Sequence, residues 1–325
     1  MLAYIVRRLL YAIPILVGVN LLTFALFFVV NTPDDMARMQ LGVKRVTPEA
    51  IEKWKAERGY DRPLFWNGDA EGLGKATQTI FFGKSVRMFA FDFGRADDGR
   101  DIGREIATRM GPSLAVAVPV FVLGLFAAIS FALLLVYFRA SYLDTAGVVL
   151  CVAMMSISGL FYIIGGQWLV SKVWHLVPIS GYAAGLASAK FLILPVIIGI
   201  VGGIGASTRW YRTIFLEEIG KDYVRTARAK GLAERLVLFR HVLRNALIPI
   251  LTGVVVVIPT LFMGSLLIES FFGIPGLGSY TIDAINAQDF AVVRSMVFIG
   301  SLLYIVGLLL TDISYTLVDP RIRFQ

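Results

Sequence analysis

The sequence predicts an all-α integral membrane protein with six transmembrane helices. Hydrophobic residues make up 57% of the 325 residues, charged residues make up 17%, and the mean hydropathy is +0.73. This balance is far from that of a soluble domain. Six stretches without charged residues each approach or exceed the length that crosses a bilayer's hydrocarbon core. They are residues 9–33, 110–138, 145–171, 191–208, 245–268 and 295–311.

Two other architectures explain these stretches less well. A soluble protein rarely needs six buried apolar helices separated by clusters of charge. The strands of a transmembrane β-barrel would alternate apolar and polar residues over about ten positions. The two shortest stretches, 191–208 and 295–311, barely reach the roughly 17 residues of the shortest spanning helices. We therefore expect the residues that follow them, Arg209 and Asp312, at a membrane interface.

The first stretch is expected to remain in the protein as transmembrane helix 1, within residues 1–34. It is longer than the apolar region of a secretory signal peptide, and no clear small-residue cleavage site precedes Asp34. Residues 35–109 then form a long external segment, interpreted as a solvated cap, with a substrate-binding lobe as the alternative. The Thr-Pro-Glu sequence at 47–49 is typical of a helix start and Gly59 of a helix end, so one short external helix is expected.

Basic residues predict the orientation of the remaining core domain, residues 110–325. With the N-terminus inside, the inner side carries fourteen of them: Arg7, Arg8, Arg139, nine between Arg209 and Arg244, Arg321 and Arg323. The two short outer loops hold Lys172, Lys190 and Arg294. The charges of the long external segment do not count, because long loops cross the membrane largely regardless of charge. Both termini are therefore expected in the cytoplasm.

No residue pattern points to chemistry within the chain. Cys151 lies inside the third stretch without an activating neighbour, and His175 and His241 are not at metal-ligand spacing. Residues 78–85 and 68–76 approach a phosphate-binding loop, but the first lacks the initial glycine and the second lacks the spacing and the hydroxyl. We expect no catalytic residue, no metal site, no cofactor in this chain and no nucleic-acid partner.

The most informative segment is the loop at about 209–244, which carries nine basic and four acidic residues. Its apolar residues recur at helical spacing on both sides of Gly231, which predicts two amphipathic helices joined by a left-handed glycine turn. They are Leu216, Ile219, Tyr223, Val224 and Ala227 before the turn, and Leu232, Leu236, Phe239, Leu243 and Ala246 after it. Basic charge alone serves attraction to anionic membrane lipid. The small residues Thr226, Ala227 and Ala229 favour close approach by a protein partner instead.

At these residues the chain resembles the inner-membrane permease subunits of ATP-binding-cassette importers. Arg225-Thr226-Ala227, then Gly231, then Leu247-Ile248-Pro249 match that family's small-residue patch, its glycine and its proline-terminated exit. DYVRTARAKGL at 222–232 and HVLRNALIP at 241–249 are similar to the dipeptide/oligopeptide branch. Arg225 in place of a glutamate, and Leu243-Arg244 in place of Leu-Pro, depart from the wider superfamily as this branch does.

The resemblance covers nearly the whole chain. Residues 5–24 look like the branch's first span, 47–64 and 92–94 like its external segment, 264–293 like its Pro-Gly-Leu-Gly outer turn, and 312–324 like its closing tail. The tail is similar to that of microcin C-type peptide importers. The pattern is blurred at 65–91 and 175–190. The resemblance implies peptide import, and it leaves dipeptide, oligopeptide, microcin-like peptide, nickel, glutathione and sugar open as the cargo.

The resemblance also implies the fold of a type I importer permease in the cell inner membrane, with several partners. A second, homologous permease completes the path, two cytoplasmic ATPases bind ATP and Mg, an extracytoplasmic protein delivers the cargo, and lipid surrounds the spans. The helix before Gly231 would dock on an ATPase, so this chain itself is not an enzyme. The residues expected to carry the coupling are Asp222, Tyr223, Arg225, Thr226, Ala227, Arg228, Ala229, Lys230, Gly231, His241, Arg244, Asn245 and Pro249.

Three polar residues outside the loop are candidates for the substrate path. We expect Glu269, Asp283 and Asn286 near the external mouth, where they could meet a peptide's amino terminus, because an acid at the edge of a span is costly without a role. The alternative is interfacial anchoring or salt bridging.

Two other classes of membrane protein fit the sequence less well. An ion-driven transporter would usually carry acids or histidines within its spans and an internal repeat, and a membrane enzyme would carry a nucleophile, base or metal cluster. The six stretches carry no acids or histidines, and no such cluster is found in the sequence.

Overall fold

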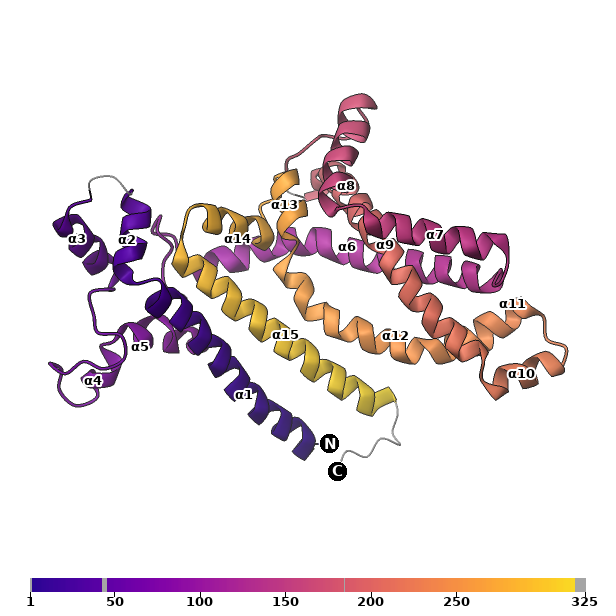
Figure 1. Cartoon of the computed structure of the whole chain (residues 1–325), viewed down its shortest axis with the longest axis horizontal. Coiled ribbons are helices and arrows are strands. Elements are labelled where there is room, and N and C mark those ends of the chain that lie inside the picture. The colour runs from indigo at the N-terminus through magenta and orange to yellow at the C-terminus, as the bar shows by residue number, and fades with distance from the viewer. Residues whose placement is uncertain (1, 43–45, 184, 319–325) are drawn as a thin grey trace. The chain divides into compact units, whose positions relative to one another are not determined.

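The computed structural model describes residues 2–42, 46–183 and 185–318, and helices dominate them (Figure 1). Within these ranges the β-structure is limited to an isolated bridge between Arg95 and Asp101. The prediction of an all-α protein is confirmed. The chain divides into two compact units, Met1–Arg109 with Tyr280–Leu309, and Met110–Ser279 with Leu310–Gln325.

The first unit gathers short helices at one end of a long apolar helix (Figure 1). Its elements are α1 (Leu2–Ala25), the π-helix η1 (Leu26–Val30), α2 (Pro33–Leu41), α3 (Pro48–Arg58), α4 (Gly74–Thr77), α5 (Ile80–Lys84), the 3₁₀ helix η2 (Val86–Ala90), and parts of α14 (Leu277–Asn286) and α15 (Phe290–Val318). Aromatic residues form its core. The rings of Phe28 and Tyr60 lie 5.3 Å apart, and Trp54 packs 5.5 Å from Tyr60. This core fixes α3 against the end of the first span.

The ends of α3 are those that its sequence predicts. The Thr47 hydroxyl accepts a hydrogen bond from the Ala50 N–H at 3.3 Å, and Gly59 ends the helix with a φ of +67°. The prediction of a single short helix in this segment is wrong, however, because α2, α4, α5 and η2 also form. α2 begins with a reciprocal cap between Thr32 and Asp35, and the others have five residues or fewer, too short for an apolar period to reveal.

The second unit contains most of the long helices. Its elements are α6 (Ile102–Tyr137), α7 (Tyr142–Ser156), α8 (Gly159–Gly166), the π-helix η3 (Gln167–Val173), the 3₁₀ helix η4 (Gly185–Ser188), α9 (Ala189–Ile219), α10 (Asp222–Ala229), α11 (Glu234–Leu236), the π-helix η5 (Val237–Leu243), α12 (Arg244–Val257), the 3₁₀ helix η6 (Ile258–Met263) and α13 (Leu266–Phe272). α7 and α9 pack so closely at Gly205 that a Cβ there would lie only 2.7 Å from the Cys151 carbonyl oxygen. Small residues bring membrane helices together in this way.

Within the described residues, five helices are long and apolar enough to cross a membrane. They are Val6–Val30, Ile102–Tyr137, Ala189–Ile219, Glu234–Met263 and Phe290–Ser314, and they match five of the six predicted stretches. The stretch at 145–171 is not one straight helix, because Tyr142–Ser156 and Gly159–Val173 meet at 88°. The bend leaves carbonyl groups without helical partners, and the Tyr162 hydroxyl donates to the Met154 oxygen at 2.7 Å. Counting this pair as one span gives six.

A π-helical turn changes which side chains of the basic loop face inward. The predicted apolar face after Gly231 includes Leu236 and Phe239, but these side chains are 42% and 62% exposed. Val237, Leu238 and Val242 are buried in their place. η5 is π-helical, and its i→i+5 hydrogen bonds widen the turn, so a count based on 3.6 residues per turn misplaces Leu236 and Phe239. Ala246, on the same predicted face, is buried as expected. The first predicted helix is also divided, because α9 ends at Ile219 and α10 begins at Asp222.

Candidate functional site

α10 is a short, separately bounded helix between α9 and Gly231. Lys221 is extended at its N-terminus, and Asp222 in the first turn complements the positive end of the helix. Gly231 has a φ of +78°, and its N–H donates to the Arg228 carbonyl at 2.9 Å. A Cβ at Gly231 would meet no atom within 4 Å. The glycine is therefore required by the left-handed backbone and not by lack of space.

The inner face of α10 is part of a continuous apolar core with the ends of three spans. Val224 and Ala227 are 0% and 4% exposed. They share a cluster of buried residues with Ala132, Leu133 and Val136 of α6, Phe215 of α9, Val237, Leu238 and Val242 of η5, and Ala246 and Ile250 of α12. Because packed interiors are dense and deform little, a displacement of α10 is passed on to α6, α9 and α12.

A carboxylate connects α10 to its neighbours. Glu234 at the start of α11 accepts hydrogen bonds from Arg228 at 2.9 and 3.0 Å and from Arg139 at 2.8 Å. Arg139 follows α6, so this one side chain joins three elements. A second pair joins α9 to α7, where Arg212 binds Asp144 through two nitrogens at 2.9 and 2.8 Å. Two-pronged arginine contacts of this kind fix geometry as well as charge.

The outer face of α10 borders a pocket of about 450 Å³. It is lined by Tyr223, Thr226, Ala227, Lys230, Leu232, Leu236, Arg240 and His241. The Tyr223 hydroxyl donates to the Glu218 carboxylate. Burial, and then the charge and hydrogen bond of Glu218, raise the pKa of Tyr223 to about 12, so the phenol stays neutral. The pocket offers apolar walls with a basic rim, which suits a partner side chain or loop.

The structure brings five of the predicted coupling residues, Tyr223, Thr226, Ala227, Lys230 and His241, together around this pocket. The side chain of Ala227 is largely covered by its own chain, and that of Arg228 is turned toward Glu234. The others lie on the loop's surface or beyond the pocket: Asp222 and Arg225 form an exposed ion pair at 3.5 Å, Ala229, Arg244 and Pro249 are exposed, and the Asn245 amide donates to the His241 carbonyl at 2.7 Å.

Sequence reasoning missed Glu234 and Arg139 as parts of this site. In the sequence, Glu234 is one of four acids in the loop, and Arg139 indicates only the orientation of the chain. They are 95 positions apart, and no local period connects them. A lone acid directly after a basic helix and its glycine turn was the available signal for Glu234.

Glu269, a candidate for the substrate path, is fully buried and bound by its own chain. Its carboxylate accepts hydrogen bonds from the backbone N–H groups of Gly278 at 2.7 Å, Ser265 at 3.1 Å and Ser279 at 3.2 Å. A Cβ at Gly276 would overlap this carboxylate. Gly276 of the Pro-Gly-Leu-Gly turn therefore makes room for the buried Glu269 carboxylate beside the start of α14.

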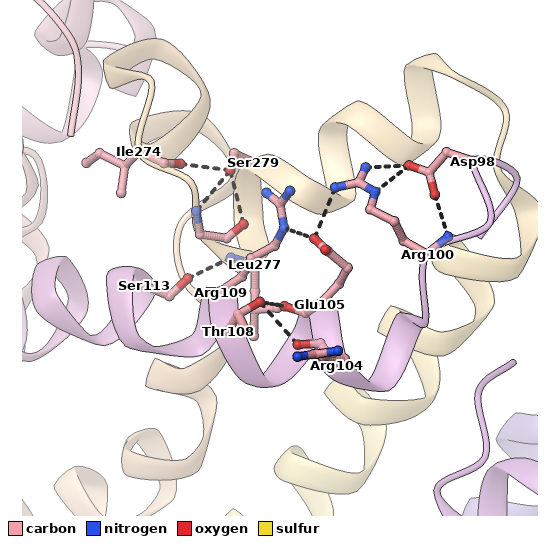
Figure 2. Close-up of polar contacts among 11 residues, drawn as sticks. Asp98, Arg100, Arg104, Glu105, Thr108, Arg109, Ser113, Ile274, Leu277 and Ser279 are labelled. Atoms are coloured by element: carbon pink, nitrogen blue, oxygen red, sulfur yellow. Dashed lines mark hydrogen bonds and ion pairs between the residues drawn. The ribbon is translucent and has the colours of Figure 1, made fainter. Parts of the chain in front are cut away.

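Neighbouring polar contacts complete that turn (Figure 2). The Leu277 N–H donates to the Ser113 hydroxyl at 2.7 Å, and the Ser279 hydroxyl donates to the Ile274 carbonyl at 2.8 Å. The other two candidates, Asp283 and Asn286, are exposed on α14. In the part of the chain that the structure describes, no three His, Cys, Asp or Glu side chains are grouped so as to hold a metal ion.

Comparisons with known proteins find relatives along the full chain. Residues 113–324 match the inner membrane component of binding-protein-dependent transport systems, and residues 1–85 match the N-terminal region of such components. A Brucella abortus protein named for a peptide transport system permease is 32% identical over 332 residues. The dipeptide transport system permease protein DppB of Escherichia coli and the oligopeptide transport system permease protein AppB of Bacillus subtilis are each 30% identical. All three comparisons cover 100% of both chains.

Proposed function

Because the chain belongs to the family of inner membrane components of binding-protein-dependent transport systems, as a permease of the dipeptide/oligopeptide type, we propose that it forms half of the path by which an ATP-driven importer moves di- and oligopeptides. It is a multi-pass inner membrane protein and a transport subunit rather than an enzyme. In this proposal a second permease supplies the other half, a binding protein delivers peptide, and two ATPases bind ATP on the cytoplasmic side.

The packing of α10 is the observation that best supports a coupling role for the 217–249 loop. A helix that receives force from an ATPase needs an exposed face for contact and a second face fixed to the moving spans. α10 has both, since Arg225 and Thr226 are exposed while Val224 is fully buried in the cluster that also contains residues of α9 and α12. The Glu234 contacts add a polar connection to the end of α6. Alternating access then follows from rigid-body movement of these spans.

Thr226→Trp tests the coupling role, because residue 226 faces solvent beside the pocket and its replacement leaves the core intact. We expect ATP-dependent uptake of alanyl-alanine by vesicles with the complete transporter to fall on the order of tenfold or more. The variant should still insert into the membrane, and its free energy of unfolding should match that of the wild type. Co-purification of the ATPases shows whether docking or transmission has failed.

Thr145→Trp is the matched control. Thr145 is also exposed, and its hydroxyl donates to the carbonyl four residues before it, as the Thr226 hydroxyl does. Uptake by this variant should match the wild type. Normal ATP-driven uptake by Thr226→Trp would show that this face of α10 does not couple ATP hydrolysis to transport.

A separate competition assay on the wild type defines the cargo. Longer peptides, nickel, glutathione and a sugar are each tested for their ability to reduce the uptake of alanyl-alanine.

A further inference from the structure

A second pocket, wholly within the first unit, is bordered by basic side chains. It has a volume of about 430 Å³ and lies between the end of α3 and the α5–η2 segment. Arg58, Arg62, Lys84 and Arg87 line it, and Glu57 is the single carboxylate among the described lining residues. This volume falls in the range of small-molecule sites, roughly 300–1,000 Å³.

Two of these four cations lack carboxylate partners among the described residues. Arg58 binds Asp97 at 2.9 Å, and Arg87 lies 3.6 Å from Asp92. No such contact occurs at Arg62, which is exposed, or at Lys84, whose ammonium lies 5.2 Å from the ring centre of Tyr60. The pocket therefore collects more positive charge than the structure neutralises.

Lys84 is partly buried, as Arg58 is, whereas Arg62 and Arg87 are exposed. The Lys84 backbone carbonyl accepts a hydrogen bond from the fully buried Arg294 at 3.4 Å. Burial, and then the charges of Arg294, Arg62, Arg58 and Arg87, lower the pKa of Lys84 to about 8. A bound anion would relieve this repulsion.

The short helix beside the pocket does not account for this arrangement. The first N–H groups of α5 are already satisfied, because Ile80 donates to the Pro63 carbonyl, Phe81 to the Leu64 carbonyl and Phe82 to the Thr79 hydroxyl. A ligand would therefore meet the side chains of Arg62 and Lys84 and not the backbone. Guanidinium and ammonium groups bind carboxylate and phosphate strongly.

We propose that the pocket formed by Arg58, Arg62, Lys84 and Arg87 is a binding site for an oxyanion, either a carboxylate or a phosphate. Arg62 and Lys84 supply the free positive charge, and Arg58 is held in place by Asp97. This site is independent of α10 and of ATP coupling. The anion belongs either to a soluble solute such as a peptide carboxyl terminus or to the phosphate of a lipid headgroup.

Calorimetric titration of the full chain in dodecyl maltoside micelles, which contain no phosphate, tests the proposal, with inorganic phosphate and alanyl-alanine as the probes. We expect Arg62→Gln and Lys84→Met each to weaken binding on the order of tenfold. Lys53→Met removes an exposed lysine from α3 outside the pocket and should bind as the wild type does. Thr226→Trp should also bind normally, which separates this site from the coupling proposal.

The pH dependence gives a second measure. Wild-type affinity should fall as pH rises through about 8, because Lys84 then loses its proton. The arginines that face it, Arg58, Arg62, Arg87 and Arg294, stay charged, so binding weakens without vanishing. In Lys84→Met this step should be absent.

The two sources of anion give different patterns. Binding of alanyl-alanine but not of its C-terminal amide identifies a solute carboxylate. Binding of inorganic phosphate that is suppressed when phosphatidylglycerol is added to the micelles identifies a lipid headgroup. Either pattern, when lost in Arg62→Gln, supports the site. The proposal is overturned if the wild type binds neither phosphate nor alanyl-alanine. It is also overturned if Arg62→Gln and Lys84→Met bind as tightly as the wild type. The remaining explanation of the basic pocket would then be a contact with an acidic protein surface.

Discussion

The loop around α10 and the pocket beside α5 both gather arginine and lysine, but Arg228 of the loop has a carboxylate partner, whereas two cations of the pocket have none among the described residues. Beside α10, the single carboxylate of Glu234 binds both Arg228 and Arg139, and all three side chains are about two-thirds buried. In the pocket, Arg62 and Lys84 have no such partner among the described residues. The same residue types therefore hold a structure together in one place and leave charge available in the other.

The difference fits the roles proposed for the two regions. A helix that transmits force must be rigid, and buried, two-pronged ion pairs restrict movement between elements. Cations without a partner at close range repel each other and lower the stability of the folded chain. An anion bound to them from outside the chain would remove this repulsion. Paired and unpaired basic clusters can thus be distinguished by how stability responds to pH and to removal of a charge.

The largest expected effect is at Lys84. Its folded pKa of about 8 lies below the ordinary value of 10.5, so the unfolded chain holds more protons between these values and stability rises with pH across this window. Relative to Lys84→Met, the wild type should gain up to about 3 kcal/mol between pH 7 and pH 10.5. Denaturant unfolding in detergent without added phosphate measures this, with Lys53→Met as the matched control. A constant difference across that range would mean that the pKa of Lys84 is not lowered in the folded chain.

A smaller loss is expected from Glu234→Gln. The variant removes the shared acceptor of Arg139 and Arg228, which are both partly buried, and should lower the free energy of unfolding by about 1–3 kcal/mol. The same unfolding assay measures it. Unchanged stability would remove the distinction between the paired loop and the unpaired pocket.

The smallest effect is expected at the exposed pair on α10. Arg225 and Asp222 have side chains that are 73% and 95% exposed, so water screens the pair and Arg225→Gln should change stability by less than about 0.5 kcal/mol. Because the variant stays folded, any change in its peptide uptake reports on the surface of α10 and not on stability. A large loss of stability would show that α10 depends on its surface charges and not on the Val224 core.

Much of the fold follows from the sequence, because the signals are local. Continuous apolar runs locate the spans, the Thr47-Pro48 start and the Gly59 end define α3, and Gly231 takes the left-handed turn that was predicted for it. Residue composition, helical period and turn preference each act over a few neighbouring positions. The chain alone therefore establishes an all-α membrane protein with a basic, small-residue loop.

The tertiary structure decides what depends on distant contacts. The bend at 157–158, the inward face of η5 and the buried carboxylate of Glu269 arise from backbone hydrogen bonds that no apolar count detects. The pairing of charges belongs to the same class, since Arg139 meets Glu234 across 95 positions and Arg294 reaches the Lys84 carbonyl across 210. Electrostatic energy depends on burial and on the distance between charges in space. The sequence therefore gives the number of charged residues, but only the fold determines which of them have a partner of opposite charge.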